Sequence, residues 1–291
     1  MGRGALTLDP ARIGGGLPAG RENAALRGPA APPPPPLPAS GRIIGIRRDP
    51  CYVRRTSLAC PDTTIGRGHA RQEERMGFYE RHVGPRLVRC ACAMANVSAE
   101  REKIVPRAAG TVLEVGFGPG LNLPFYDPAR VSRVIGVDPN EAFLKLGAAR
   151  RRAAKIPVEI RTAPAESLPL EDACVDTAVI TYTLCSVHDP MRSLSEVRRV
   201  LRPGGRALFL EHGLSRDPKV ARWQSRLNPL WRAVAVGCNL IRPVAASFRA
   251  AGFALTELEE YYLPGTPKPL SYFSRGVAHA VQGGPASGGG P

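Results

Sequence analysis

A run of β-forming residues that contains an acid and leads into a glycine-rich turn constrains this chain more than any other segment. Residues 111–115 read Thr-Val-Leu-Glu-Val, and Gly116, Gly118 and Gly120 follow at two-residue spacing. The apolar run predicts a buried parallel strand, and the glycines predict a turn whose backbone approaches a ligand closely. We therefore expect a nucleotide-like cofactor beside this turn.

The position of the acid argues against a dinucleotide as that cofactor. The dinucleotide fingerprint requires G-x-G-x-x-G, whereas its third glycine position is Leu121 in this chain. Glu114 stands two residues before the first glycine, where its charge would repel a pyrophosphate and attract a cationic ligand. An acid followed by G-x-G-x-G resembles the motif of class I S-adenosylmethionine methyltransferases, whose cofactor carries an amino-acid tail and a sulfonium.

The first 75 residues differ in composition from the rest of the chain. They contain 11 glycines and 11 prolines, a share typical of disordered segments, and residues 32–36 are all proline. We expect a disordered leader over residues 1–75 and interpret Met76 as an alternative start of translation. A targeting peptide is the competing interpretation, because the segment has many arginines and few acids but no apolar core.

From residue 76 onward the sequence alternates strand-like and helix-like blocks. We expect an N-terminal helical lid over 76–108, with helices at 76–95 and 99–105, then a methyltransferase domain over 109–282 and a disordered tail over 283–291. Within the domain, the expected strands after the first are 131–137, 157–161, 175–181, 206–210, 253–263 and 271–280. The expected helices are 140–152, 189–201, one within the insertion 213–241, and 243–251.

This order of elements predicts an α/β fold of the Rossmann-like, doubly wound kind. We expect a mostly parallel seven-stranded sheet with an antiparallel last strand, because Pro264, Gly265 and Pro267 fit a reversal before that strand. The segment 202–205, Arg-Pro-Gly-Gly, is expected to end the preceding helix. Ligands then bind beyond the carboxyl ends of the strands, near the glycine turn.

Asp138 ends the second expected strand, 18 residues after Gly120. An acid at this place is positioned to accept hydrogen bonds from both ribose hydroxyls. The alternative is a turn acid, since Asp138, Pro139 and Asn140 also make a good entry to a helix.

Residues 161–170, Arg-Thr-Ala-Pro-Ala-Glu-Ser-Leu-Pro-Leu, extend the resemblance. From about residue 76 to 281 the chain resembles the type 11 methyltransferase family, which also methylates quinone precursors and many small molecules. The motifs that carry this resemblance are residues 114–120, 137–138, 165–170 and 201–205. The resemblance implies S-adenosylmethionine as the cofactor, bound by Glu114, Gly116, Gly118, Gly120, Asp138, Pro139, Ala165, Glu166 and Thr181. The family commonly has an acid before Ala165, whereas this chain has Pro164, so a backbone group at Ala165 is expected to contact the adenine.

The acceptor side resembles a narrower branch of that family, through residues 183–187, 211–212, 222–224 and 237–240. This branch contains alkyl-thiol methyltransferases and some phosphatidylethanolamine N-methyltransferases, which implies a small-molecule or lipid substrate with an S or N nucleophile. Such an acceptor must lose a proton. The candidate groups are Tyr182, Cys185, His188, Glu211 and His212, of which we expect His212, Glu211 and Tyr182 to be catalytic.

Four side chains near the expected acceptor site need an interpretation. His212 could act as a general base, but a lone histidine after a strand more often makes a hydrogen bond that stabilises the fold. Cys185 is expected to form a wall of the pocket, since methyl transfer needs no covalent intermediate. Trp223 and Trp231 line an apolar acceptor pocket or else belong to the core.

The net charge of +15 raises the question of nucleic-acid binding, which we do not expect. Arginine outnumbers lysine 35 to 5 along the chain, which indicates coding bias, and the arginines at 150–152 fall at an expected helix end. An RNA or protein methyltransferase of the same fold is an alternative, but 181–184 read Thr-Tyr-Thr-Leu where an Asn-Pro-Pro-Tyr type of segment would hold a planar amine. A non-catalytic cofactor-binding protein is the other alternative.

The seven cysteines contain no C-x-x-C pair and no histidine at zinc spacing, so we expect no metal. Their odd number without a signal peptide indicates a reducing compartment, and we expect a cytoplasmic protein. No apolar run reaches the roughly 18 residues of a membrane-spanning helix. Peripheral membrane contact through the basic, Trp-bearing segment 215–242 stays open, as does the oligomeric state.

Overall fold

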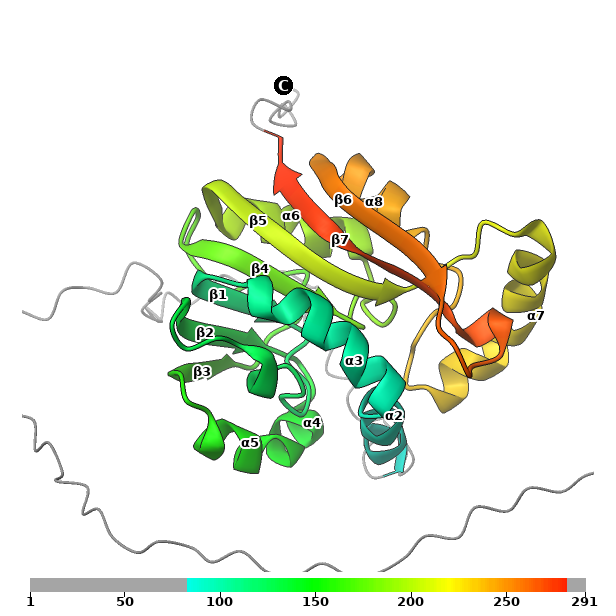
Figure 1. Ribbon diagram of the computed structural model, residues 1–291, viewed down its shortest axis with the longest axis horizontal. Coiled ribbons are helices and arrows are strands. Elements are labelled where there is room, and N and C mark those ends of the chain that lie inside the picture. The colour runs from blue at the N-terminus through cyan, green and yellow to red at the C-terminus, as the bar shows by residue number, and fades with distance from the viewer. Residues whose placement is uncertain (1–82, 282–291) are drawn as a thin grey trace, which may run out of the picture. The chain divides into compact units, whose positions relative to one another are not determined.

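The computed structural model describes residues 83–281 (Figure 1). The expected leader 1–75, the tail 283–291 and the first part of the helix expected at 76–95 lie outside the described residues. Within residues 83–281, none of the helices combines the length and the apolarity needed to cross a bilayer.

Seven strands form one sheet in the order β3-β2-β1-β4-β5-β7-β6. The strands are β1 (Gly110–Val115), β2 (Val131–Val137), β3 (Val158–Arg161), β4 (Val175–Thr181), β5 (Leu201–His212), β6 (Phe253–Tyr262) and β7 (Tyr272–Ala280). The pairs from β3 to β5 are parallel, and β7 runs antiparallel to both β5 and β6. The predicted sheet, including its reversed last strand, is confirmed.

Helices cover both faces of this sheet (Figure 1). They are α2 (Gly84–Cys92), α3 (Ala95–Ile104), α4 (Glu141–Leu146), α5 (Ala148–Ala153), α6 (Pro190–Val200), α7 (Pro218–Val234) and α8 (Val244–Ala250), with short 3-10 turns at Val105–Arg107, Leu123–Phe125 and Lys268–Leu270. Leu113 packs in a core cluster with residues of α6 and α8, whereas its neighbour Val112 packs in another cluster with residues of α3 and α4. Alternate side chains of β1 therefore enter opposite layers, as expected for a strand buried on both faces.

The helix expected over 140–152 is divided at Gly147 into α4 and α5. Asn140 caps the first piece, because its side chain accepts hydrogen bonds from the N–H groups of Ala142 and Phe143. A side chain at Gly147 would come within 2.9 Å of the Pro119 backbone, so this glycine lets the helical segment approach the glycine turn.

The segment 202–205 follows the end of α6 at Val200, as expected, and is part of β5, which begins at Leu201. Val175 pairs with Leu201, yet Thr177 pairs with Arg206, so β5 has extra residues that form a bulge opposite β4. Gly204 has a φ of +78°, which suits this bulge. The strand expected at 206–210 therefore begins earlier, at Leu201, because Gly204 and its neighbours form a bulge within the strand.

Candidate functional site

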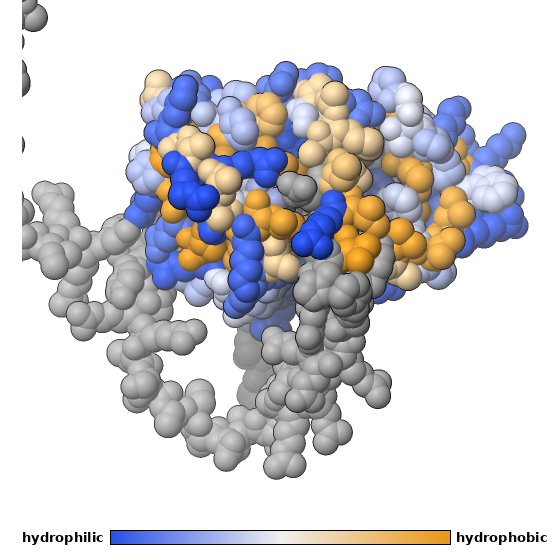
Figure 2. All heavy atoms as spheres, turned by 90° about the horizontal axis from the view of Figure 1, so that it is seen from below, coloured by the Kyte–Doolittle hydropathy of each residue, from blue (hydrophilic) through white to orange (hydrophobic). Residues whose placement is uncertain are grey.

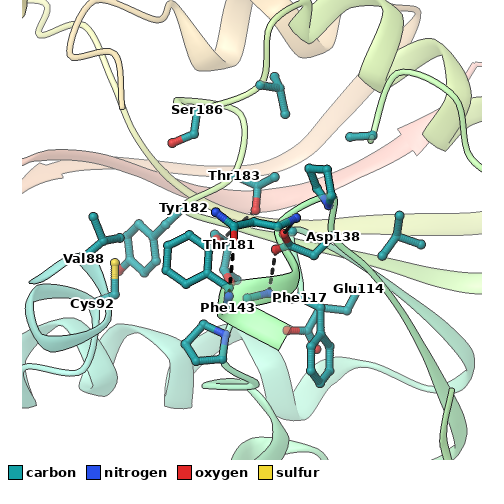
Figure 3. A pocket seen from close by; sticks show the side chains of 18 of the residues that line it. Val88, Cys92, Glu114, Phe117, Asp138, Phe143, Thr181, Tyr182, Thr183 and Ser186 are labelled. Atoms are coloured by element: carbon teal, nitrogen blue, oxygen red, sulfur yellow. Dashed lines mark hydrogen bonds between the residues drawn. The ribbon is translucent and has the colours of Figure 1, made fainter. Parts of the chain in front are cut away.

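A cavity of about 400 Å³ lies at the carboxyl ends of β1, β2 and β4, where the strand order reverses direction (Figure 3). The structure brings most of the expected cofactor residues together in its lining: Glu114, Gly116, Gly118, Asp138, Pro139, Ala165, Glu166 and Thr181. Tyr182, expected to be catalytic, also lines it. Gly120, Glu211 and His212 do not.

The three glycines of the turn share a positive φ but differ in the space around them. Gly116, Gly118 and Gly120 all have φ between +54° and +70°, a region that favours glycine. A side chain at Gly116 would clash with Thr183, and one at Gly120 would crowd Leu123. At Gly118 a Cβ would approach only the Gly116 carbonyl, 3.9 Å away, so this stretch of backbone borders open space. Gly120 therefore supports the turn, while Gly116 and Gly118 border the cavity.

Asp138 links the turn to the next helix. One carboxylate oxygen accepts a hydrogen bond from the Gly118 N–H at 2.8 Å, and the other accepts one from the Asn140 N–H at 2.8 Å. Burial raises the pKa of Asp138, and these two backbone donors oppose that rise. The carboxylate both supports the local backbone and lines the cavity, so the two interpretations of this acid are compatible.

Glu114 is the buried acid of the site, with 1% of its surface exposed. Its oxygens accept hydrogen bonds from Asn122 Nδ2 at 3.0 Å and from the Tyr126 hydroxyl at 2.7 Å. Burial raises its pKa to about 7, although both hydrogen bonds and the nearby Arg101 charge favour the ionised form. Burial is therefore the largest influence on this carboxyl group.

Arg101 is a cavity residue that the sequence reasoning missed. It comes from α3, its Nε donates to Asn122 Oδ1 at 3.1 Å, and its guanidinium lies 4.7 Å from the centre of the Tyr182 ring. Asn122 thus lies between a buried cation and the buried Glu114. Asn122 is close in sequence to the glycine turn, two residues beyond Gly120. Arg101 lies far from the turn in sequence, and no motif around it indicates a role in the cavity.

Tyr182 is held in an unusual conformation at the end of β4. Its φ is +57°, rare for a residue with a side chain, and its N–H donates to the Leu210 carbonyl at 2.9 Å. The hydroxyl is buried and has no hydrogen-bond partner among the described residues. Burial raises the pKa of Tyr182 well above its usual range, so this hydroxyl is available as a donor inside the cavity wall.

The structure places Glu211 and His212, two residues expected to be catalytic, outside the lining of the cavity. Glu211 is fully buried and accepts the Thr183 N–H at 2.7 Å, and burial raises its pKa to about 7. His212 is also buried, with Nδ1 3.6 Å from Cys238 Sγ and its ring against Phe273. Both belong to the last residues of β5, which pair with β7, so they lie outside the lining of the cavity.

The structure also places the other residues that were expected near the cavity. Cys185 is buried but does not line the cavity, so it is no pocket wall. Neither tryptophan lines the cavity: Trp223 is 55% exposed on α7, and Trp231 lies on the same helix. Glu166 does line the cavity, and its Oε1 accepts the N–H groups of His188 and Asp189, which holds the loop after β3 to the start of α6.

An open parallel sheet with a glycine turn, a buried acid and a strand-end acid around one cavity defines a Rossmann-like methyltransferase of class I. Residues 113–209 match the family model described as a methyltransferase domain. The human thiol S-methyltransferase TMT1B is 37% identical over 176 residues, which cover 58% of this chain and 69% of that protein. The rat thiol S-methyltransferase TMT1B is 37% identical over 153 residues, covering 51% of this chain and 62% of that protein.

The chain therefore belongs to the family of S-adenosylmethionine-dependent methyltransferases that contains these relatives. It spans about two thirds of the length of the rat and human proteins. A solved geranyl diphosphate methyltransferase in complex with S-adenosylmethionine is similar in fold, with a TM-score of 0.52 and 18% identity over 63% of this chain and 85% of that one.

The steric role of Gly116 can be tested by comparison with Gly204, which has a similar φ. Gly204→Ala places a side chain at φ +78° where no atom lies within 4 Å, so it should cost only the strain of that conformation, about 1–2 kcal/mol. Gly116→Ala, at φ +70°, should lower the free energy of unfolding by about 1–3 kcal/mol more, because Thr183 is in the way. Urea unfolding measures both variants, and equal losses would contradict the proposed clash.

Proposed function

We propose that this protein transfers a methyl group from S-adenosylmethionine to the sulfur of a small or lipid-like thiol. The observation that carries the proposal is that one cavity joins the glycine turn and Glu114 to Tyr182 and the loop after β4. A donor and an acceptor can therefore occupy neighbouring parts of the same cavity.

The residues of the cavity fit the proposed cofactor. Its volume, about 400 Å³, lies in the range of roughly 300–1,000 Å³ typical of small-molecule sites. The buried Glu114 and Arg101 offer opposite charges for the ammonium and carboxylate of an amino-acid tail. We assign Asp138 to the ribose hydroxyls, and Pro164, Ala165 and Glu166 to the edge of the adenine, because all four line the adjoining part of the cavity.

The acceptor end of the cavity is largely uncharged. Val88, Val187, Ala235 and Val236 line it, together with Ser186. An apolar thiol gains from burial against such side chains. The thiol S-methyltransferase relatives support sulfur as the nucleophile. An amine of a nucleic acid or protein would need an Asn-Pro-Pro-Tyr type of segment after β4, whereas residues 181–184 read Thr-Tyr-Thr-Leu.

When bound, the sulfonium supplies an electrophilic methyl group that the acceptor displaces in line. The chain positions the reactants and excludes water. We assign the Tyr182 hydroxyl to orient the acceptor and His188 to take its proton, because His188 is the histidine in the cavity lining. Glu211 acts as a positioning residue, since it holds the backbone of Thr183, which lines the cavity.

Cofactor binding should depend on pH through Glu114. Its pKa of about 7 means that the ionised form, which attracts the cofactor ammonium, is about tenfold less populated at pH 6 than at pH 8. Calorimetry should therefore show affinity rising about tenfold from pH 6 to pH 8, and Glu114→Gln should bind more weakly with no such slope. Glu211→Gln is the matched control: that acid also has a pKa of about 7 but lies outside the cavity, so the slope should persist. A flat wild-type profile would contradict this role.

Methyl transfer should be detectable with a cofactor labelled in its methyl group. We expect product with small apolar thiols and little with amines, phosphatidylethanolamine vesicles or quinone precursors. Tyr182→Phe should lower kcat/KM by about tenfold through loss of one hydrogen bond to the acceptor, with cofactor affinity unchanged. Tyr272→Phe, outside the cavity, should match the wild type. Cofactor binding without methylation of any acceptor would favour the non-catalytic alternative.

We also propose that α7 contacts an anionic lipid surface. Trp223, Leu230 and Val234 form an exposed stripe on this helix, whereas its buried side carries Gln224 and Asn228. Leu230 is 68% exposed. Figure 2 shows hydrophobic residues exposed among hydrophilic ones toward the end of the molecule where α7 lies. Apolar side chains with flanking arginines suit the interface of a membrane.

Sedimentation with vesicles of phosphatidylcholine and phosphatidylserine tests this surface. Wild-type protein should sediment with the vesicles, and the double variant Trp223→Ser, Leu230→Ser should stay in solution because it loses most of the exposed apolar area. Met191→Ser, an exposed apolar residue on α6, is the control and should behave like the wild type. Equal sedimentation of all three proteins would exclude α7 as the contact.

A further inference from the structure

Three metal-ligating side chains from distant parts of the chain meet outside the cavity. Cys185 follows β4, His212 ends β5, and Cys238 follows α7. Their sulfur and nitrogen ligand atoms all lie within 4.8 Å of one another, and Cys238 Sγ lies 3.6 Å from His212 Nδ1. Neither cysteine has a metal-site spacing along the sequence, so only the fold reveals this group.

The spacing of these atoms suits a tetrahedral zinc ion. With Zn–S near 2.3 Å and Zn–N near 2.0–2.1 Å, a sulfur and a nitrogen on one tetrahedral ion lie about 3.6 Å apart. The observed separation of Cys238 Sγ and His212 Nδ1 has this value. Two thiolates and one imidazole are also the ligand types that zinc prefers.

The surroundings of the cluster carry a second sign of a missing partner. Glu211 is adjacent to His212 and fully buried, and its Oε2 has no hydrogen-bond partner among the described residues. A buried carboxylate oxygen without a donor is costly unless a cation or a proton compensates it. Cys185 and His212 are buried, whereas Cys238 is partly exposed and provides a route from solvent.

We propose that Cys185, His212 and Cys238 bind one Zn²⁺, independently of the proposed methyl transfer. Binding releases the two thiol protons to solvent and forms two Zn–S bonds and one Zn–N bond. The fourth position is left for water. The ion would join the loop after β4 to the loop after α7, and both loops line the acceptor end of the cavity through Ser186 and Val236.

Zinc titration of the full-length, reduced and chelator-treated protein tests the site. The wild type should bind one Zn²⁺ at the cluster. Its Tm should then rise, because the ion binds the folded state and not the unfolded one. Cys238→Ser should weaken that binding by at least about hundredfold, more than the loss of an outer-shell partner costs. Cys90→Ser removes an exposed cysteine of α2 and should retain wild-type binding.

Cobalt substitution gives a readout that does not depend on the stability of a variant. The wild type loaded with Co²⁺ should show a thiolate-to-cobalt charge-transfer band, and Cys90→Ser should show the same band. The proposal is overturned if the wild type shows neither the band nor a zinc-dependent Tm, or if Cys238→Ser binds Zn²⁺ as tightly as the wild type. A Cys185–Cys238 disulfide found by alkylation and mass spectrometry in protein purified without reductant, together with no zinc binding after reduction, would assign the pair to redox chemistry instead.

Discussion

The site depends on the close approach of the backbone after β1 to the backbone after β4. Gly116 leaves no room for a side chain against Thr183, whose hydroxyl donates to the Val115 carbonyl at 2.9 Å. On the other side, the Glu211 carboxylate accepts a hydrogen bond from the N–H of the same Thr183. These contacts fix the two ends of the cavity relative to each other, so the geometry of the cofactor turn and of the acceptor loop is set jointly.

The electrostatics of the cavity follow from burial. Glu114 and Glu211 are both fully enclosed, and burial raises the pKa of each to about 7. Their partners differ: Glu114 lies beside Asn122 and Arg101 in the cavity, whereas Glu211 meets only backbone donors and has one unpartnered oxygen. The same physical effect therefore acts on two acids with different surroundings: Glu114 borders the cavity, whereas Glu211 lies near the thiol and imidazole cluster.

The proposed acceptor side is assembled from segments that β5 separates in sequence. The loop after β4 and the loop after α7 both reach the cavity, and the Asn239 N–H donates to the Cys185 carbonyl at 2.8 Å between them. A zinc ion at the neighbouring cysteines would strengthen this connection without entering the cavity. Acceptor selection and lipid contact would then share α7 and the loop that follows it.

The sequence by itself determined the local features of this protein. It placed β2 and β4 at their observed residues, the glycine turn after β1, and Asp138 at the end of β2, because apolar periodicity and glycine requirements act over a few residues. Only the tertiary structure decided which distant residues meet. Arg101 reaches the cavity from α3, Glu211 and His212 lie outside it, and Cys185 joins Cys238, because packing of the layers and pairing of β5 with β7 set those distances.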